Sequence, residues 1–146
     1  MTSLDRDVVR RKLAHIAETL EALRPLARLT LTEYLGRLYE RKAAERLLQV
    51  AIEAMVDVST HLVVGLGRPA PVDAYGSVVA LGTAGALEGD LAARLAPATG
   101  LRNRLVHEYD GLDDRKVHEA LAAALDDLTE FVVQVERFLA GLPQTD

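Results

Sequence analysis

Apolar residues recur along this chain at three- and four-residue steps, the spacing of one face of an α-helix. The pattern predicts a first helix from about Leu4 to Leu23, ended by Pro25. A second helical pattern runs from about Thr32 to Val64, with a break or bend at Gly36. Glycines and prolines between residues 65 and 71 then interrupt the periodicity and indicate a loop.

The second half of the chain repeats this organisation with shorter elements. A helix is expected over Ser77 to Leu87, and another begins near Gly89 with an interruption around Pro97. Helical spacing resumes over 101–107, and Asp113 is a typical N-cap for a long last helix. Because no useful length of chain alternates with period two, the predicted fold is all-α, an up-and-down bundle of four to five helices.

The length and composition are typical of one globular domain. The chain has 146 residues, of which 49% are apolar and 27% charged. We expect a single helical domain over residues 1–141 and a short tail over 142–146. No apolar run is expected to be long enough to cross a bilayer, and the polar start of the chain does not resemble a signal peptide. These features favour a cytoplasmic protein.

Cysteine content and charge narrow the chemistry. The chain has no cysteine, which excludes disulfides, thiol nucleophiles and cysteine-ligated zinc. Its formal net charge is −5, whereas a protein that coats nucleic acid is expected to be basic. Any contact with RNA should therefore be local, as in an enzyme that binds its substrate briefly.

The segment 102–109, with the sequence RNRLVHEY, concentrates the side chains that can carry chemistry. An arginine binds phosphate through a planar fork of donors, and a histidine exchanges a proton near neutral pH without a metal. Arg102 and His107, with Asn103 beside the arginine, are therefore candidates for cutting a phosphodiester whose own 2′-hydroxyl is the nucleophile. Such a phosphodiester occurs in RNA.

The spacing of this pair leaves the geometry open. Five residues on an α-helix amount to roughly 140° of rotation, so Arg102 and His107 do not share a face. They converge if the helix ends near His107, if Arg102 reaches around, or if a second subunit brings its own copy. The alternative is that Arg102 and Arg104 are solvated charges and that His107 only complements the helix dipole.

A second polar constellation lies in the long second helix. Gln49, Glu53, Asp57 and His61 follow one another at four-residue steps and form one stripe. The stripe is either a solvated outer face or a surface that faces the catalytic cleft and supports the pair, with Asp57 fixing a histidine tautomer. A metal site built from Glu53, Asp57 and His61 lacks further ligands, so we expect no metal.

Cations also recur between residues 37 and 46, where two glutamates interrupt them. Such a run is usually a solvated face, although it could guide an RNA backbone or dock an acidic partner. The cations are Arg37, Arg41, Lys42 and Arg46. The remaining histidines, His15 and His118, are expected at the surface.

The segment 102–109 resembles the R-x4-H-x-Y motif of HepT-type toxins, which belong to the HEPN ribonuclease superfamily and are paired with minimal nucleotidyltransferase (MNT) antitoxins. Residues 44–54, followed by Asp57 and His61, are similar to the family's long second helix. The resemblance covers the chain from about Leu4 to Leu139. The chain departs from it over 82–86, where small residues replace the bulkier ones that we expected.

The resemblance implies a HEPN-like helical bundle that forms a homodimer, with the active cleft at the dimer interface. Arg102 and His107 would be the catalytic pair of a metal-independent endoribonuclease, with Asn103 as an auxiliary group and no cofactor. Tyr109 would be the position to which the antitoxin transfers AMP. The alternative is a non-catalytic module that binds nucleotide or docks a nucleotidyltransferase partner. Composition alone supports only a helical scaffold.

Overall fold

The structure is a computed structural model that describes residues 4–107 and 113–143, except for the side chains of Arg102, Val106 and His107. These residues form seven α-helical segments and no strand, which confirms the predicted all-α fold. The segments are α1 (Arg6–Ala27), α2 (Leu31–Gly36), α3 (Leu38–Gly65), α4 (Ala74–Thr83), α5 (Gly89–Leu95), α6 (Ala98–His107) and α7 (Asp114–Gly141).

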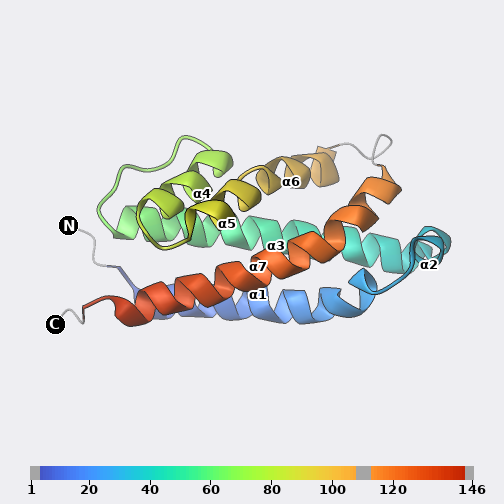
Figure 1. Cartoon of the computed structure of the whole chain (residues 1–146), viewed down its shortest axis with the longest axis horizontal. Helices are drawn as coiled ribbons and strands as arrows, with labels where there is room; N and C mark the ends of the chain where they lie inside the picture. The colour runs from blue at the N-terminus through green and yellow to red at the C-terminus, as the bar shows by residue number, and fades with distance from the viewer. Residues whose placement is uncertain (1–3, 108–112, 144–146) are drawn as a thin grey trace.

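Three long helices form the body of the molecule. α1, α3 and α7 pack along one another, and α1 runs antiparallel to the other two (Figure 1). The shorter α4, α5 and α6 lie along α3 and cover another of its sides (Figure 1). The short α2 lies at the end of the molecule opposite the two termini, close to the start of α7 (Figure 1).

The helix boundaries follow local sequence signals, with two exceptions. One is α4, which covers Ala74–Thr83 rather than the predicted Ser77 to Leu87, because Asp73 caps its start and the chain turns at Gly85. The predicted break at Gly36 is confirmed, because Arg37 adopts an extended conformation with φ −120° between α2 and α3. Asp113 is confirmed as the N-cap of α7, where its side chain accepts from the Arg115 N–H (3.0 Å) and the Lys116 N–H. Pro97 separates α5 from α6.

The other exception is the end of the first helix, where the prediction that Pro25 ends it was wrong. α1 continues to Ala27, because Pro25 lies in the last turn and its missing N–H removes a single intrahelical hydrogen bond. The Arg28 N–H then donates to the Pro25 carbonyl at 3.3 Å and closes that turn.

α3 is the central helix of the bundle. Among the described residues it is the one helix long and apolar enough to cross a membrane by length and composition, contrary to our expectation that the chain contains no such run. Its apolar character follows from its position, because α3 contacts α1, α4, α6 and α7. Leu48, Ile52 and Met55 on this helix are almost completely buried.

The small residues at 82–86 have a packing role. A Cβ added at Gly82 would lie 2.8 Å from the Ala92 Cβ, so α4 and α5 approach too closely for a side chain at this position. Gly85 has φ +88°, a conformation that favours glycine, in the turn that follows α4. The Ala86 N–H donates to the Leu81 carbonyl at 3.2 Å across this turn.

Arg6 ties the start of α1 to the end of α7. Its guanidinium donates to the carbonyls of Leu139 (3.4 Å) and Leu142 (3.3 Å), and also to that of Pro143. The first two residues of the predicted tail are thus held against the bundle. Residues 144–146 lie outside the described part of the chain.

Candidate active site

The motif helix α6 packs against the polar stripe of α3, and a hollow of about 440 Å³ lies between them and α4. Side chains from all three helices line this hollow. They are Ile52, Glu53, Val56, Asp57 and Thr60 of α3, Ala74 of α4, and Thr99 and Asn103 of α6. The structure therefore brings the predicted site residue Asn103 together with Glu53 and Asp57.

The members of the polar stripe have different surroundings. The Gln49 side-chain amide donates to Glu53 Oε1 at 3.1 Å, and Glu53 is half-buried. Asp57 is exposed and forms an ion pair with Lys12 of α1, with 2.5 Å between Nζ and Oδ2. His61 is half-buried and is not among the residues that line the hollow. The stripe is thus neither a uniform solvated face nor a uniform cleft wall.

For Arg102 and His107 the structure describes the backbone positions in α6 and not the side chains. His107 follows Asn103 by one helical turn, and Asn103 follows Thr99 by one turn, so these three positions fall on one face of the helix. Arg102 precedes Asn103 by one position, about 100° around the helix. Tyr109 and the rest of 108–112 lie outside the described residues, so its predicted role stays a prediction.

The other side of α6 borders a separate groove against α7. This groove has a volume of about 280 Å³ and contains Arg104 and several alanines of α7. Arg94 and Asp127 form an ion pair beside it, with 3.2 Å between Nε and Oδ1. Because Asn103 lines the hollow on α3 and Arg104 lines this groove, neighbouring motif residues serve different surfaces.

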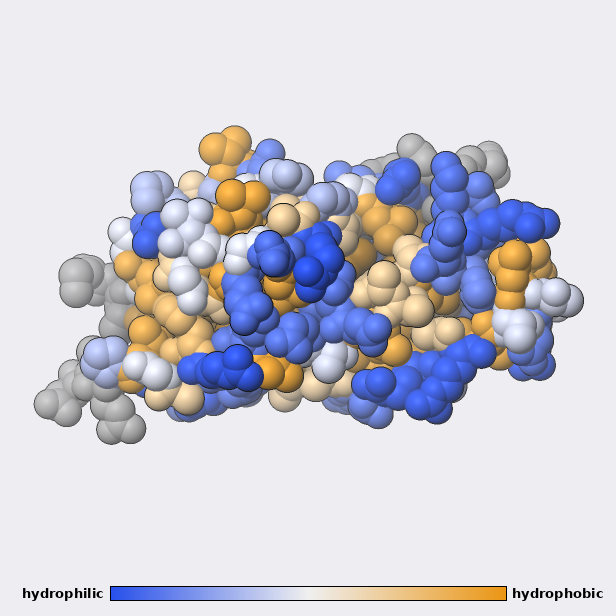
Figure 2. Space-filling view, viewed as in Figure 1, coloured by the Kyte–Doolittle hydropathy of each residue, from blue (hydrophilic) through white to orange (hydrophobic). Residues whose placement is uncertain are grey.

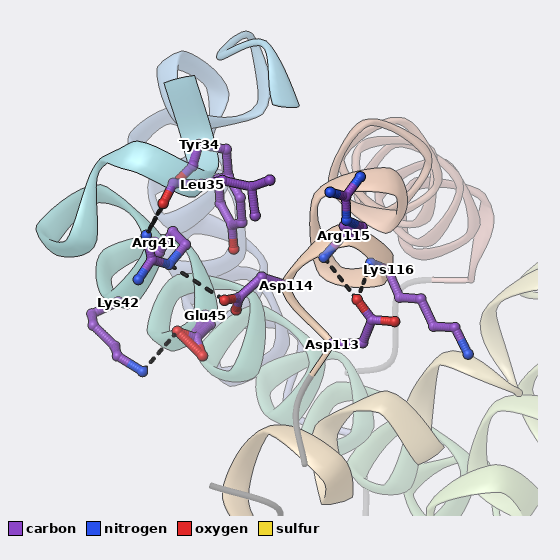
Figure 3. Close-up of polar contacts among 9 residues, drawn as sticks. All are labelled: Tyr34, Leu35, Arg41, Lys42, Glu45, Asp113, Asp114, Arg115 and Lys116. Atoms are coloured by element: carbon purple, nitrogen blue, oxygen red, sulfur yellow. Dashed lines mark hydrogen bonds and ion pairs between the residues drawn. The ribbon is translucent and has the colours of Figure 1, made fainter. Parts of the chain in front are cut away.

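Arg41 is half-buried and engaged with neighbouring helices, contrary to the expectation of a solvated basic face for the run 37–46. Its guanidinium donates to the carbonyls of Leu35 (2.5 Å) and Tyr34 (3.5 Å) at the end of α2. Nε lies 3.6 Å from Asp114 Oδ2 in the first turn of α7 (Figure 3). Arg41 therefore joins α2, α3 and the start of α7.

His118 completes this junction, and its predicted position at the surface was wrong. The ring is half-buried, with 5.2 Å between its centroid and that of Tyr34, and Nε2 lies 2.7 Å from the Leu29 carbonyl oxygen. Because a carbonyl only accepts, Nε2 carries the proton. The signal for burial was the place of His118 beside Val117 and Leu121 on the buried side of α7.

Tyr34 is fully buried in the same junction. Burial raises the pKa of its phenol, and the carboxylates of Glu45 and Asp114 raise that pKa further. Its hydroxyl has no hydrogen-bond partner among the described residues. Tyr34 therefore stays neutral throughout the physiological range and contributes to packing.

Comparisons with known proteins agree with this architecture. A family model described as Ribonuclease HepT-like matches residues 13–135. The chain is 31% identical to a protein named tRNA nuclease HepT from Aphanizomenon flos-aquae, and the match covers 99% of this chain and 98% of that protein. It is also 35% identical to a putative RNase from Archaeoglobus fulgidus, over 63% of this chain and 69% of that protein.

The fold matches solved structures of low sequence identity. One is a tri-AMPylated HEPN toxin of Shewanella oneidensis in complex with an MNT antitoxin, with a TM-score of 0.81, 21% identity, and coverage of 90% of this chain and 98% of the toxin. The family match spans most of the chain, and the full-length relative is a nuclease. This chain therefore belongs to the ribonuclease HepT-like family, which confirms the predicted family and the predicted enzyme class, a ribonuclease.

Proposed function

We propose that this chain is the toxin of a toxin–antitoxin pair and cleaves cellular RNA without a metal ion, using Arg102 and His107. The observation that carries the proposal is the meeting of the motif residue Asn103 with Glu53 and Asp57 around one hollow. Transfer RNA is the first substrate class to test, because the relative that matches 99% of this chain is a tRNA nuclease.

The proposed reaction is internal transesterification. The 2′-hydroxyl loses its proton and attacks the adjacent phosphorus, the bond from phosphorus to the 5′-oxygen breaks, and a cyclic phosphate and a 5′-hydroxyl result. His107 would act as the base or the acid in these proton transfers. Arg102 would stabilise the negative charge that builds on the phosphoryl oxygens, and Asn103 would orient the phosphate or the imidazole.

A homodimer would supply what one chain lacks. The positions of Arg102 and His107 are roughly 140° apart on α6, and one chain offers a single motif histidine. Two subunits that face each other across the surface formed by α6 would contribute two arginines and two histidines to one cleft. We therefore propose a homodimeric cytoplasmic enzyme with its cleft between the subunits.

The stripe on α3 would support the catalytic pair. Glu53 is half-buried and already engaged with Gln49, which suits a carboxylate that orients a neighbouring polar group. Asp57 is exposed at the rim of the hollow, where it could hold a histidine tautomer contributed by either subunit. His61 stands outside the lining of the hollow, and we assign it a more distant supporting role.

A nucleotidyltransferase antitoxin would silence the enzyme. AMP transferred to the hydroxyl of Tyr109, two residues after His107, would add bulk and a negative phosphate near the motif arginine. An RNA phosphate would then meet both an occupied site and a repelling charge. The solved toxin that is tri-AMPylated supports this form of control.

Growth inhibition in a bacterial host tests the assignment. Expression of the wild-type chain without antitoxin should arrest growth, whereas Arg102→Ala and His107→Ala should be harmless and remain folded. His107→Gln keeps a polar side chain without proton exchange, so it separates catalysis from binding. If His107→Gln remains toxic while Arg102→Ala does not, the chain is a binding module instead.

A further inference from the structure

The start of α3 exposes an aromatic side chain to solvent. Tyr39 is 84% exposed and Leu38 is 54% exposed, although both are large. Figure 2 shows hydrophilic side chains gathered at this end of the molecule, where α2, the first turns of α3 and the start of α7 lie, with apolar groups exposed among them. A tyrosine ring exposed to this extent is available to stack against a nucleic-acid base.

Tyr39 shares one face of α3 with two cations and with the wall of the hollow. Lys42 and Arg46 follow Tyr39 by three and seven residues, which keeps all three on one side of the helix. Glu53 follows Arg46 by another seven residues on the same side and lines the hollow. That step is about 10 Å along the helix axis, so the surface leads directly to the candidate active site.

The two cations are free to bind a ligand. Lys42 Nζ lies 3.5 Å from Glu45, but the lysine side chain is 66% exposed, and such solvated pairs are weak and easily exchanged. Arg46 is exposed and has no ion-pair partner among the described residues. Arg41, by contrast, is held by Asp114 and the end of α2, so it does not contribute to this face (Figure 3).

We propose that Tyr39, Lys42 and Arg46 form an RNA-guiding surface that holds a single-stranded segment beside the scissile phosphate. The proposal rests on the proposed function and identifies where its substrate lies. A base would stack on Tyr39 while the adjoining phosphates contact Lys42 and Arg46, the combination used for single-stranded nucleic acid. Because phosphates bind to individual lysines and arginines, two cations on one face can hold RNA although the net charge of the chain is −5.

Binding of an uncleavable probe tests the surface independently of catalysis. The probe is a single-stranded 2′-O-methyl RNA of about twelve nucleotides, which lacks the attacking hydroxyl. Fluorescence anisotropy across a salt series would compare the wild-type chain, Lys42→Gln/Arg46→Gln, Tyr39→Ala and Tyr39→Phe. The charge-matched control is Arg10→Gln/Arg137→Gln, which removes two exposed cations near the other end of the bundle.

The logarithm of the binding constant falls linearly with the logarithm of the salt concentration, and each phosphate contact to a single strand contributes about 0.7 to the steepness of that line. We therefore expect Lys42→Gln/Arg46→Gln to make the line less steep by about 1.4. Tyr39→Ala should weaken binding about tenfold, and Tyr39→Phe should retain the affinity because its ring still stacks. Equal affinities for the α3 variants and the control would overturn the proposal.

Two further outcomes separate this proposal from the function on which it rests. If the α3 variants bind the probe normally but no longer bind the nucleotidyltransferase partner, the surface is a protein-docking site and the proposal is wrong. If wild-type protein cleaves RNA in a manner that depends on His107 while the α3 variants bind the probe normally, the proposed function stands and the guiding surface alone fails.

Discussion

Asn103 of α6 and Glu53 of α3 line the same hollow, although they are far apart in the sequence. Each belongs to a different polar pattern, the motif at 102–109 and the stripe at 49–61. The two residues meet because α6 packs along α3. The short helices α4 and α5 return the chain to this side of α3 before α6 begins (Figure 1). The relationship turns two separate sequence features into one candidate site.

Removing the amide should therefore reduce activity without loosening the fold. Asn103→Ala is expected to lower the rate of RNA cleavage on the order of a hundredfold, the effect of losing one donor that stabilises developing charge. Asn103 is exposed, so the midpoint of thermal unfolding should stay unchanged. Glu53→Gln should also slow cleavage. Its control is Glu136→Gln, which changes an exposed glutamate on α7 and should leave the cleavage rate unchanged. Wild-type rates in Asn103→Ala would remove Asn103 from the site.

Glycine substitutions should have opposite effects at two positions. Gly82→Ala is expected to lower the free energy of unfolding by about 1–3 kcal/mol, because the new Cβ would meet the Ala92 Cβ at 2.8 Å. Gly100→Ala is the matched control, since nothing lies within 4 Å of the added Cβ inside α6. It should raise that free energy by about 0.5–1 kcal/mol. Urea unfolding measures both, and a stable Gly82→Ala would mean that α4 and α5 pack less closely.

Alkaline unfolding should report on Tyr34. Its pKa is raised in the folded chain, chiefly by burial, so the neutral phenol stabilises the fold below the ordinary pKa of about 10. That contribution is lost as the pH rises above this value, because only the unfolded chain ionises there. Tyr34→Phe should match the wild type within about 1 kcal/mol at neutral pH and exceed its stability above pH 10.

Thermal unfolding across this pH range compares the two proteins. Because the Tyr34 hydroxyl has no partner among the described residues, phenylalanine should fill the same space without leaving a polar group unpaired. A loss of more than about 2 kcal/mol at neutral pH would show instead that the hydroxyl makes a strong hydrogen bond.

Tyr109→Phe should remove the proposed control of this chain by AMP transfer. The variant is expected to cleave RNA at a rate close to that of the wild type, because the hydroxyl has no part in the proposed chemistry. Incubation with the nucleotidyltransferase and ATP should add AMP to the wild-type chain and abolish its activity, as followed by intact mass. The variant should gain no mass and keep its activity. Modification of Tyr109→Phe would place the acceptor elsewhere.

The sequence predicted most of the helices well because their signals are local. Apolar spacing and caps located the elements, including the break at Gly36 and the cap at Asp113. Pro25 misled the prediction because a proline in a last turn costs little. The apolar composition of α3 was also misjudged, since a helix contacted on several sides is nearly as apolar as a membrane span.

Contacts between distant helices could not be predicted in the same way. Arg41 and Lys42 are adjacent cations in the sequence, yet Arg41 joins three helices and Lys42 is solvated. His118 was expected at the surface and instead packs against Tyr34. The burial of each side chain depends on which helix lies opposite, and that information is absent from the spacing.

Cleavage of RNA by purified protein in excess EDTA tests the central claim most directly. The wild-type chain, with Tyr109 shown by mass to be unmodified, would be incubated with transfer RNA and messenger RNA beside His107→Ala. We predict that the wild type cleaves RNA without metal and leaves cyclic phosphate ends. His107→Ala should cleave at least a hundredfold more slowly. Cleavage that requires a divalent metal, or that survives in His107→Ala, would contradict the account.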